Sequence, residues 1–355
     1  MPYRLIRPLL FRLDAERAHS LTIAGLKMVP VPGPAPTDPM LATQVAGVAF
    51  PNPVGLAAGF DKDGAVAHKM HALGFGFSEL GTLTPRPQTG NPKPRLFRLA
   101  EDQAVINRMG FNNGGQAAAI ARLAHVDRKG RVVGVNIGAN KDSTSGGTAI
   151  DDYVAGVRAM ATYAAFLTIN ISSPNTPGLR ALQDKGALDA LLEAVMAAQG
   201  ESAKMGRSRV PIFLKVAPDL APADIDAIAA SCLTHRIDAL IVSNTTLSRP
   251  ALRSAHASET GGLSGAPLRD LALQRLKDFR SAVGPALPLI GVGGITSAED
   301  AYARICAGAA LVQLYSALVY QGPFLPRHIS KGLKHLLVRD GFTSIAQAVG
   351  CRASA

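Results

Sequence analysis

Short apolar segments recur along the chain from about residue 45 onward. They lie at residues 54–58, 77–81, 132–137, 166–171, 212–216, 239–243, 287–292 and 311–315. Stretches rich in Ala and Leu separate most of them, as at 187–199, 223–231, 271–282 and 298–307, with spacings typical of helices. Unbroken apolar strands separated by helices are typical of a parallel sheet covered on both faces. Eight such units predict an α/β fold, a closed (β/α)8 TIM barrel, with a doubly wound open sheet as the alternative.

The first 30 residues mix apolar side chains with Arg and Lys. Residues 3–11 and 13–29 have spacings compatible with two helices, and Asp14 is the candidate N-cap of the second. The Pro-rich stretch 31–39 predicts the main domain boundary. We therefore expect an N-terminal helical hairpin over residues 1–36 and a catalytic barrel over 37–355.

Two roles are open for this hairpin, and they are compatible. It packs on its own barrel, or it lies on a membrane surface with its arginines at the lipid headgroups. In the second case the residues at the acyl boundary are Leu5, Ile6, Leu9, Leu10 and Phe11. No apolar run reaches the ~18 residues that a membrane span requires, and the first residues lack the layout of a signal peptide.

Composition narrows the class of protein further. The 355 residues are 47% hydrophobic and 18% charged, which allows a large core and excludes global disorder. The three cysteines form no CxxC pair, which excludes a disulfide scaffold and suits a reducing compartment. The net charge of +11 favours an anionic membrane or small molecule over nucleic acid, because the basic residues are dispersed and aromatics are 5%. No histidine cluster has metal-ligand spacing.

A polar or Gly-rich cluster follows each predicted strand. The clusters are 59–64, 81–87, 136–142, 170–176, 215–219, 243–246, 291–294 and 315–317. In a (β/α)8 barrel these loops meet at one end and form the active-site face. The first strand is not followed by GxGxxG, which argues against a Rossmann NAD site, and no GxSxG elbow indicates a hydrolase nucleophile.

Two of these clusters indicate an anionic cofactor. Gly293 and Gly294, together with Tyr315 and Ser316, follow the last two strands, where such barrels commonly bind phosphate. The alternative is a tight turn that requires glycine. Lys215 ends an otherwise apolar strand, and a buried lysine is costly without an anion. Its anion is either a carboxylate in a structural ion pair, such as that of Asp219, or a cofactor that becomes negatively charged.

Other clusters offer groups for a substrate. Lys62 lies between two aspartates and is either part of a solvated charge cluster or a ligand-facing cation. Residues 107–113 contain three Asn around a Gly, which suits a small planar substrate with amides but is also typical of a turn. Residues 170–178 place two serines at a strand end. Either hydroxyl caps a turn or removes a proton that its surroundings accept onward.

The chain resembles the class 2, quinone-dependent dihydroorotate dehydrogenases in ten motifs, in order over about residues 45–350. The motifs are AAGFDKDG, GTLTPRPQTGNPKPRLFRL, NRMGFNN, VNIGANK, NISSPNTPGLR, LKVAPD, SNTT, GGLSG, GVGG and LVQLYSAL. The hairpin is the extension by which class 2 differs from the soluble class 1. Class 1 uses Cys as the base, so a 170–178 loop without Cys also supports class 2.

This resemblance implies an FMN flavoprotein that oxidises (S)-dihydroorotate to orotate in pyrimidine biosynthesis, with ubiquinone or menaquinone as electron acceptor. By matched position, Ser173 is the general base for the C5 proton, while hydride leaves C6 for the flavin N5. Serine is a poor base at its own pKa, so a proton exit through water or Thr is also required.

The same resemblance implies the contact residues. Those for substrate are Lys62, Asn107, Arg108, Met109, Gly110, Phe111, Asn170, Asn175, Asn244 and Thr245. Those for FMN are Ala58, Gly59, Phe60, Asp61, Lys62, Thr82, Asn136, Asn170, Lys215, Ser243, Gly265, Gly294, Tyr315 and Ser316. His19 and Arg98 match positions that line a quinone tunnel. Ser243 and Ser316 stand where many members have Thr, and either hydroxyl can donate a hydrogen bond.

We therefore expect a monomeric enzyme held peripherally on the cytoplasmic side of a bacterial inner membrane. A mitochondrial origin is less favoured, because no Arg/Ser-rich transit segment precedes the hairpin. One alternative is a soluble flavin barrel that uses fumarate or NAD, with the hairpin as a lid. Another is a phosphate-binding barrel that acts as a membrane scaffold.

Overall fold

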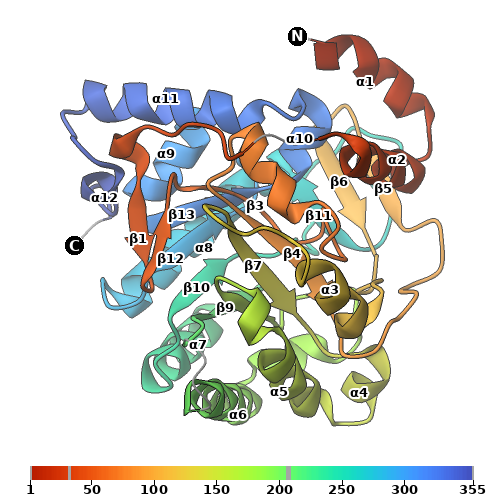
Figure 1. The fold of residues 1–355 in the computed structure, drawn as a ribbon, viewed down its shortest axis with the longest axis vertical. Coiled ribbons are helices and arrows are strands. Elements are labelled where there is room, and N and C mark those ends of the chain that lie inside the picture. Colours follow the sequence, from red (N-terminus) through yellow and green to blue (C-terminus); the bar gives the residue numbers. More distant parts are fainter. Residues whose placement is uncertain (1, 31–32, 205–208, 354–355) are drawn as a thin grey trace.

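The computed structural model describes residues 2–30, 33–204 and 209–353. Eight parallel strands close into a barrel in the order β10-β12-β13-β3-β4-β7-β8-β9 (Figure 1). They are β3 (Val54–Leu56), β4 (Phe77–Leu83), β7 (Val132–Ile137), β8 (Leu167–Asn170), β9 (Ile212–Val216), β10 (Ala239–Val242), β12 (Leu289–Val292) and β13 (Ala309–Leu314). Each coincides with one predicted segment. The predicted TIM barrel is therefore confirmed, and the open sheet is excluded.

Helices cover the outside of this barrel. The longer ones are α3 (Gly115–Leu123), α5 (Ala149–Met160), α6 (Lys185–Lys204), α7 (Pro222–Thr234), α8 (Arg269–Val283), α9 (Ala298–Cys306) and α11 (Leu325–Arg339). Short helices are η1 (Pro39–Leu41), η2 (Ala67–Leu73), α4 (Lys141–Ser145), η3 (Ala161–Tyr163), η4 (Leu179–Gln183), η5 (Ala266–Leu268), α10 (Ser316–Gln321) and α12 (Ile345–Ala348). The four helical stretches expected from the sequence coincide with α6, α7, α8 and α9.

Aromatic side chains fill the end of the barrel at which the strands begin. Phe77 and Phe166 lie with ring centroids 6.1 Å apart, and Phe166 stacks on Phe213 at 4.5 Å. An antiparallel hairpin of β1 (Thr43–Val45) and β2 (Val48–Phe50) brings Phe50 onto this layer, 5.1 Å from Phe77. This end is therefore closed by apolar packing, and only the opposite end, where the strands terminate, is available for polar chemistry.

A small antiparallel sheet, which the sequence analysis did not predict, joins two distant loops. It consists of β5 (Leu96–Leu99), β6 (Ala104–Asn107) and β11 (Gly262–Gly265), in the order β11-β6-β5. Its buried face packs Leu99, Ile106 and Leu263 together. The sheet carries Asn107 and Gly265, so it brings two predicted site residues from opposite parts of the chain to one place.

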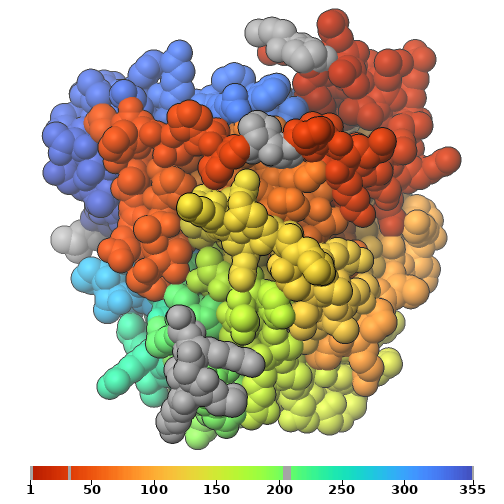
Figure 2. Space-filling model, viewed as in Figure 1, coloured from red at the N-terminus to blue at the C-terminus, as the bar shows by residue number. Residues whose placement is uncertain are grey.

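The predicted N-terminal helices are present as α1 (Pro2–Arg12) and α2 (Ala15–Met28). Asp14 is the expected N-cap: its Oδ1 accepts from the backbone amides of Glu16 and Arg17 at 3.0 and 2.9 Å. The hairpin lies beside β5 at one corner of the molecule (Figures 1 and 2). Val31 and Pro32, in the predicted Pro-rich boundary, lie outside the described residues, and the division at residue 36 stays a prediction. None of the described helices is both long and apolar enough to cross a bilayer.

Candidate active site

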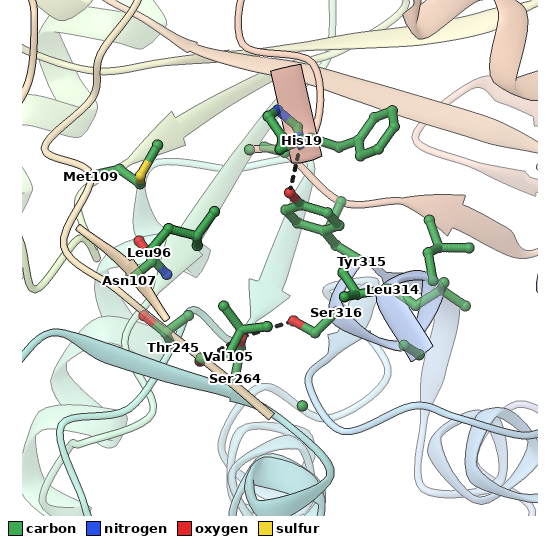
Figure 3. Close-up of a pocket in the computed structure, with 18 of the residues that line it drawn as sticks. His19, Leu96, Val105, Asn107, Met109, Thr245, Ser264, Leu314, Tyr315 and Ser316 are labelled. Carbon is green, nitrogen blue, oxygen red and sulfur yellow. Dashed lines mark hydrogen bonds between the residues drawn. The ribbon is translucent and has the colours of Figure 1, made fainter. Parts of the chain in front are cut away.

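One continuous cavity of about 540 Å³ extends from the inner face of the hairpin to the ends of the barrel strands. At the hairpin end it is lined by Leu10, Phe11 and His19, and at the barrel end by Lys215 and Gly294. Figure 3 shows His19 at one side of this space and the Ser264–Ser316 pair at another. Every predicted polar cluster except 136–142 contributes to the lining. The strand-end loops therefore form one site, as the barrel topology predicts.

Lys215 projects into this cavity from the buried interior of β9 and is only 5% exposed. Burial lowers its pKa, and the negative charge of Glu79 on β4 opposes that shift. The Glu79 carboxylate itself accepts from Asn136 Nδ2 at 2.6 Å and Gln313 Nε2 at 2.5 Å. Asp219, the alternative ion-pair partner, instead lies 3.1 Å from Arg180. Lys215 is thus a positive charge that faces the cavity, with its countercharge buried beneath it.

The two serines after β8 have different surroundings. Ser172 donates its hydroxyl to Asn170 Oδ1 at 2.8 Å and accepts from Asn244 Nδ2 at 2.9 Å. Ser173 Oγ accepts from the Asn175 backbone amide at 3.2 Å and lines the cavity. An oxygen that already accepts an N–H hydrogen bond is easier to deprotonate. Of the two serines, only Ser173 lines the cavity.

Amide side chains surround Ser173. Asn175 Nδ2 donates to Asn107 Oδ1 at 3.3 Å, and both side chains line the cavity. Asn91, which the sequence analysis missed, donates from Nδ2 to the backbone carbonyls of Asn175 and Arg108, each at 3.0 Å. It therefore ties the serine loop to the segment after β6. The result is a wall of donors and acceptors on the serine side of the cavity.

Glycines form the opposite part of the barrel end. Gly293 and Gly294 have φ of 109° and 69°, and a Cβ on Gly294 would lie 2.3 Å from Arg269 Cα. Only glycine fits this left-handed, crowded turn. The hydroxyls of Ser264 and Ser316, which line the same cavity, lie 2.8 Å apart (Figure 3). Main-chain amides and hydroxyls gathered in this way are suited to an anion such as phosphate.

The hairpin end of the cavity is apolar with few charges. His19 Nδ1 lies 3.3 Å from the Tyr315 hydroxyl (Figure 3), and burial lowers the pKa of His19 to about 4, so its ring is neutral at pH 7. Lys62 donates to the Gly59 carbonyl at 3.0 Å, and burial lowers its pKa to about 8.

Leu10 and Phe11 also line the cavity, although we expected them at the acyl boundary. They lie on the side of α1 that faces the barrel, whereas Leu5 and Leu9, on the other side, are 80% and 61% exposed.

Arg98 fixes the hairpin over this opening. Its guanidinium donates to the carbonyls of Leu10 at 3.0 Å and Phe11 at 3.3 Å, and also to that of Leu13. It also lies 4.7 Å from the centroid of the Phe11 ring. The Leu10 and Phe11 carbonyls belong to the last turn of α1 and that of Leu13 follows it, so Arg98 caps the C-terminal end of α1 from β5.

Most predicted site residues line the cavity. They are His19, Ala58, Gly59, Phe60, Lys62, Thr82, Arg98, Asn107, Met109, Gly110, Phe111, Asn170, Ser173, Asn175, Lys215, Ser243, Asn244, Thr245, Gly265, Gly294, Tyr315 and Ser316. Arg108, Asp61 and Asn136 are absent from the lining. Arg108 is paired with Glu259 at 2.7 Å. Asp61 accepts from two backbone amides of its own loop at 2.6 Å, and Asn136 lies beneath Thr82, bonded at 2.6 Å.

The sequence analysis missed Glu79, Gln313 and Ser264. A signal existed for Glu79, because it is a charged residue within an apolar strand, as Lys215 is. In the described parts of the chain, no three His, Cys, Asp or Glu side chains are grouped to hold a metal ion.

Comparisons with known proteins agree with this geometry. The family model described as dihydroorotate dehydrogenase matches residues 40–337. A "Dihydroorotate dehydrogenase (quinone)" of Sphingopyxis alaskensis is 60% identical over 353 residues, which cover 99% of this chain and 97% of that protein. One of Novosphingobium aromaticivorans is 58% identical, covering 98% and 99%. The crystal structure of DHODH from Eimeria tenella in complex with ferulenol has a TM-score of 0.90 and 38% identity, over 96% of each chain.

Proposed function

Because the chain belongs to the quinone-dependent dihydroorotate dehydrogenases, enzymes of pyrimidine biosynthesis, we propose that its cavity holds FMN, dihydroorotate and a quinone in three adjoining places. FMN lies at the barrel end, dihydroorotate lies between the flavin and Ser173, and the quinone enters from the hairpin. The observation that supports this most strongly is the continuity of one cavity from Lys215 and Ser173 to the inner face of α1 and α2.

The donor set of the barrel end fits FMN. Gly265, Gly294 and Ser316 suit its phosphate. Lys215 suits the ring, because its ammonium donates no hydrogen bond to any described residue. When bound, FMN supplies the hydride acceptor for the substrate and the electron carrier for the quinone. Lys215 stabilises negative charge near the ring, because its positive charge is fixed in a low-dielectric interior.

Ser173 removes the C5 proton of dihydroorotate. The Asn175 amide that donates to its Oγ stabilises the developing alkoxide, and the proton leaves through water or a Thr hydroxyl. Lys62 binds the substrate carboxylate, and the side chains of Asn107, Asn170, Asn175 and Asn244 bind the ring amides. The chain thus supplies a base, an orientation and an excluded-water site, while the redox chemistry belongs to the flavin.

The hairpin serves the quinone. Its inner residues Leu10 and Phe11 continue the cavity as an apolar passage, and its outer residues Leu5 and Leu9 are exposed. We place this outer face in the headgroup region of the bacterial inner membrane, on the cytoplasmic side, with the protein as a peripheral monomer. A quinone then reaches the flavin end without crossing water.

An anaerobic absorption spectrum of the purified protein tests the proposal. We expect the oxidised-flavin bands before addition of dihydroorotate and their bleaching afterwards, with orotate formed in equal amount to the flavin present. A colourless protein that takes up no FMN would contradict the cofactor assignment. A yellow protein whose spectrum is unchanged by dihydroorotate would contradict the substrate assignment.

A further inference from the structure

Arg304, on α9, is a buried cation outside the cavity lining. It is 1% exposed and has the largest side chain among the fully buried described residues. No described carboxylate lies within 4.0 Å of its guanidinium. Burial lowers its pKa to about 10, so it is charged at pH 7. The charges of Asp300 and Asp270 oppose this shift from beyond ion-pair distance. A buried cation that no carboxylate contacts is costly, so this arginine requires an explanation from its surroundings.

The carboxylate nearest in sequence is already paired. Asp300 lies 3.0 Å from Arg269 Nε and accepts from the Thr296 hydroxyl at 2.7 Å. Arg269 Nη2 in turn donates to Thr296 Oγ1 at 3.0 Å. This network pairs Asp300 directly with Arg269, so the Asp300 charge acts on Arg304 only from beyond ion-pair distance.

Arg304 instead holds two backbone carbonyls. Its Nη2 donates to the Arg269 carbonyl at 2.6 Å and to the Gly293 carbonyl at 2.9 Å. The peptide between Gly293 and Gly294 is trans, so its N–H points away from its carbonyl. No described residue accepts a hydrogen bond from that Gly294 amide. Both glycines line the cavity. Arg304 thus holds this peptide by its carbonyl, and the Gly294 N–H, on the opposite side of the peptide, has no acceptor among the described residues.

We propose that Arg304 is a positioning residue for the phosphate of FMN: it orients the Gly293–Gly294 peptide so that the amide meets the phosphate, and its positive charge favours that anion through the loop. The inference rests on the proposed binding of FMN and deepens it. The phosphate, in return, adds a negative charge on the side of the loop opposite a guanidinium that no described carboxylate contacts.

A comparison of FMN with riboflavin isolates this role, because riboflavin carries the same ring without the phosphate. The dissociation constant of each flavin is measured from the flavin fluorescence that appears when the holoenzyme is diluted. The FMN form of each protein is measured first, and the riboflavin form is measured after FMN has been exchanged for riboflavin. We expect Arg304→Gln to weaken FMN binding by about tenfold or more, as for the loss of one charged contact. Riboflavin binding should change less than about threefold. Equal weakening of both flavins would show a merely structural role and overturn the proposal, and so would an unchanged affinity for FMN.

Arg280→Gln is the matched control. Arg280, on α8, also donates to two backbone carbonyls, those of Gly284 and Gly308, and it is outside the cavity lining. The Arg280→Gln variant should have the same ratio of FMN affinity to riboflavin affinity as the wild type. A ratio that falls as far in Arg280→Gln as in Arg304→Gln would overturn the assignment to Arg304.

Arg304→Lys keeps the test decisive if Arg304→Gln does not fold. The lysine retains the charge but not the planar fork, so FMN binding should weaken by less than in the glutamine variant, about two- to fivefold, with riboflavin unaffected. Unchanged binding of FMN, or equal weakening of both flavins, again overturns the inference. A wild-type protein that binds no FMN would instead refute the proposed function.

Discussion

At the scale of single residues, burial lowers the pKa of three cations that differ in their partners. Lys215 has a buried countercharge in Glu79 and faces the cavity, and Lys62 is hydrogen-bonded to Gly59 at the hairpin end. Arg304 has only carbonyl partners. Because charge is costly to bury, we propose a ligand anion for each of them: the reduced flavin for Lys215, the substrate carboxylate for Lys62 and the FMN phosphate for Arg304.

Ser173→Ala should keep the FMN spectrum and slow flavin reduction by dihydroorotate by orders of magnitude, about 10²-fold or more, since the general base is lost. Stopped-flow absorbance under anaerobic conditions measures this step alone. Ser172→Ala is the control, because its hydroxyl bonds Asn170 and Asn244 rather than facing the cavity. We expect it to weaken substrate binding without a comparable loss in the reduction rate. Equal rates for Ser173→Ala and wild type would remove Ser173 as the base.

Lys215→Met should lower the midpoint potential of the bound flavin by about 30 mV or more, because negative charge on the reduced flavin loses its neighbouring cation. Spectroelectrochemical titration gives this value. Lys62→Met is the comparison, and we expect a raised KM for dihydroorotate with little change in potential. A potential that shifts in the Lys62 variant and not in the Lys215 variant would reverse the two assignments.

His71 should make the fold sensitive to acid. It is 1% exposed, its Nε2 accepts from the Val132 amide at 3.0 Å, and burial lowers its pKa from 6.5 to about 4. As the pH falls, His71 is therefore protonated in the unfolded chain before it is protonated in the folded chain. Its contribution to the free energy of unfolding is complete above pH 6.5 and is lost as the pH falls toward 4. His71→Gln should flatten the dependence of Tm on pH in this window. The control His125→Gln, at an exposed histidine, should leave that dependence unchanged. Parallel profiles for His71→Gln and wild type would contradict this.

At the scale of elements, the hairpin is attached to the barrel by contacts with its helix ends. Arg98 caps α1, and Lys69 donates to the Leu26, Lys27 and Val29 carbonyls at the end of α2, at 2.8 to 3.0 Å. Glu16 of α2 forms a two-point pair with Arg95, at 2.7 and 3.1 Å. Because barrel side chains hold the C-terminal ends of both α1 and α2, the hairpin has a defined place over the cavity. Its removal should therefore affect flavin reoxidation by quinone more than flavin reduction by dihydroorotate.

Deletion of residues 1–36 should spare flavin reduction by dihydroorotate and impair reoxidation by a long-tailed quinone by about tenfold or more, because the apolar passage loses its wall. Rapid mixing with each substrate separates the two half-reactions. Arg98→Met frees the α1 carbonyls while leaving the barrel whole, and should act in the same direction with a smaller effect. Quinone turnover equal to wild type in both variants would count against the passage.

At the scale of the whole molecule, the two ends of the cavity face different surroundings. The barrel end is polar and enclosed, whereas the hairpin presents Leu5, Leu9 and Leu21 outward, the last 58% exposed. Several exposed leucines on two short helices are typical of a surface that lies against lipid. In the membrane placement that we propose, this apolar surface adjoins the end of the cavity at which the quinone enters.

A double variant, Leu5→Ser with Leu9→Ser, should bind vesicles containing anionic lipid about tenfold or more weakly, since each buried leucine contributes about 1.5–3 kcal/mol. Sedimentation with the vesicles measures it. The control is the double variant Leu233→Ser with Leu247→Ser, because these leucines lie outside the hairpin and are 41% and 49% exposed. Turnover with fumarate or NAD as good as with quinone would favour the soluble alternative, as would vesicle binding unchanged by the double variant.

The sequence by itself determined the eight strands, the hairpin with its Asp14 cap, and the end of the barrel at which polar residues gather, because local periodicity and capping chemistry set these features. Only the tertiary structure decided that Lys215 has Glu79 rather than Asp219 as its countercharge, and that Arg108 turns to Glu259. It also decided that β6 pairs with β11. Such pairings join residues distant in the chain, and they are fixed only when the barrel closes and brings particular strands together.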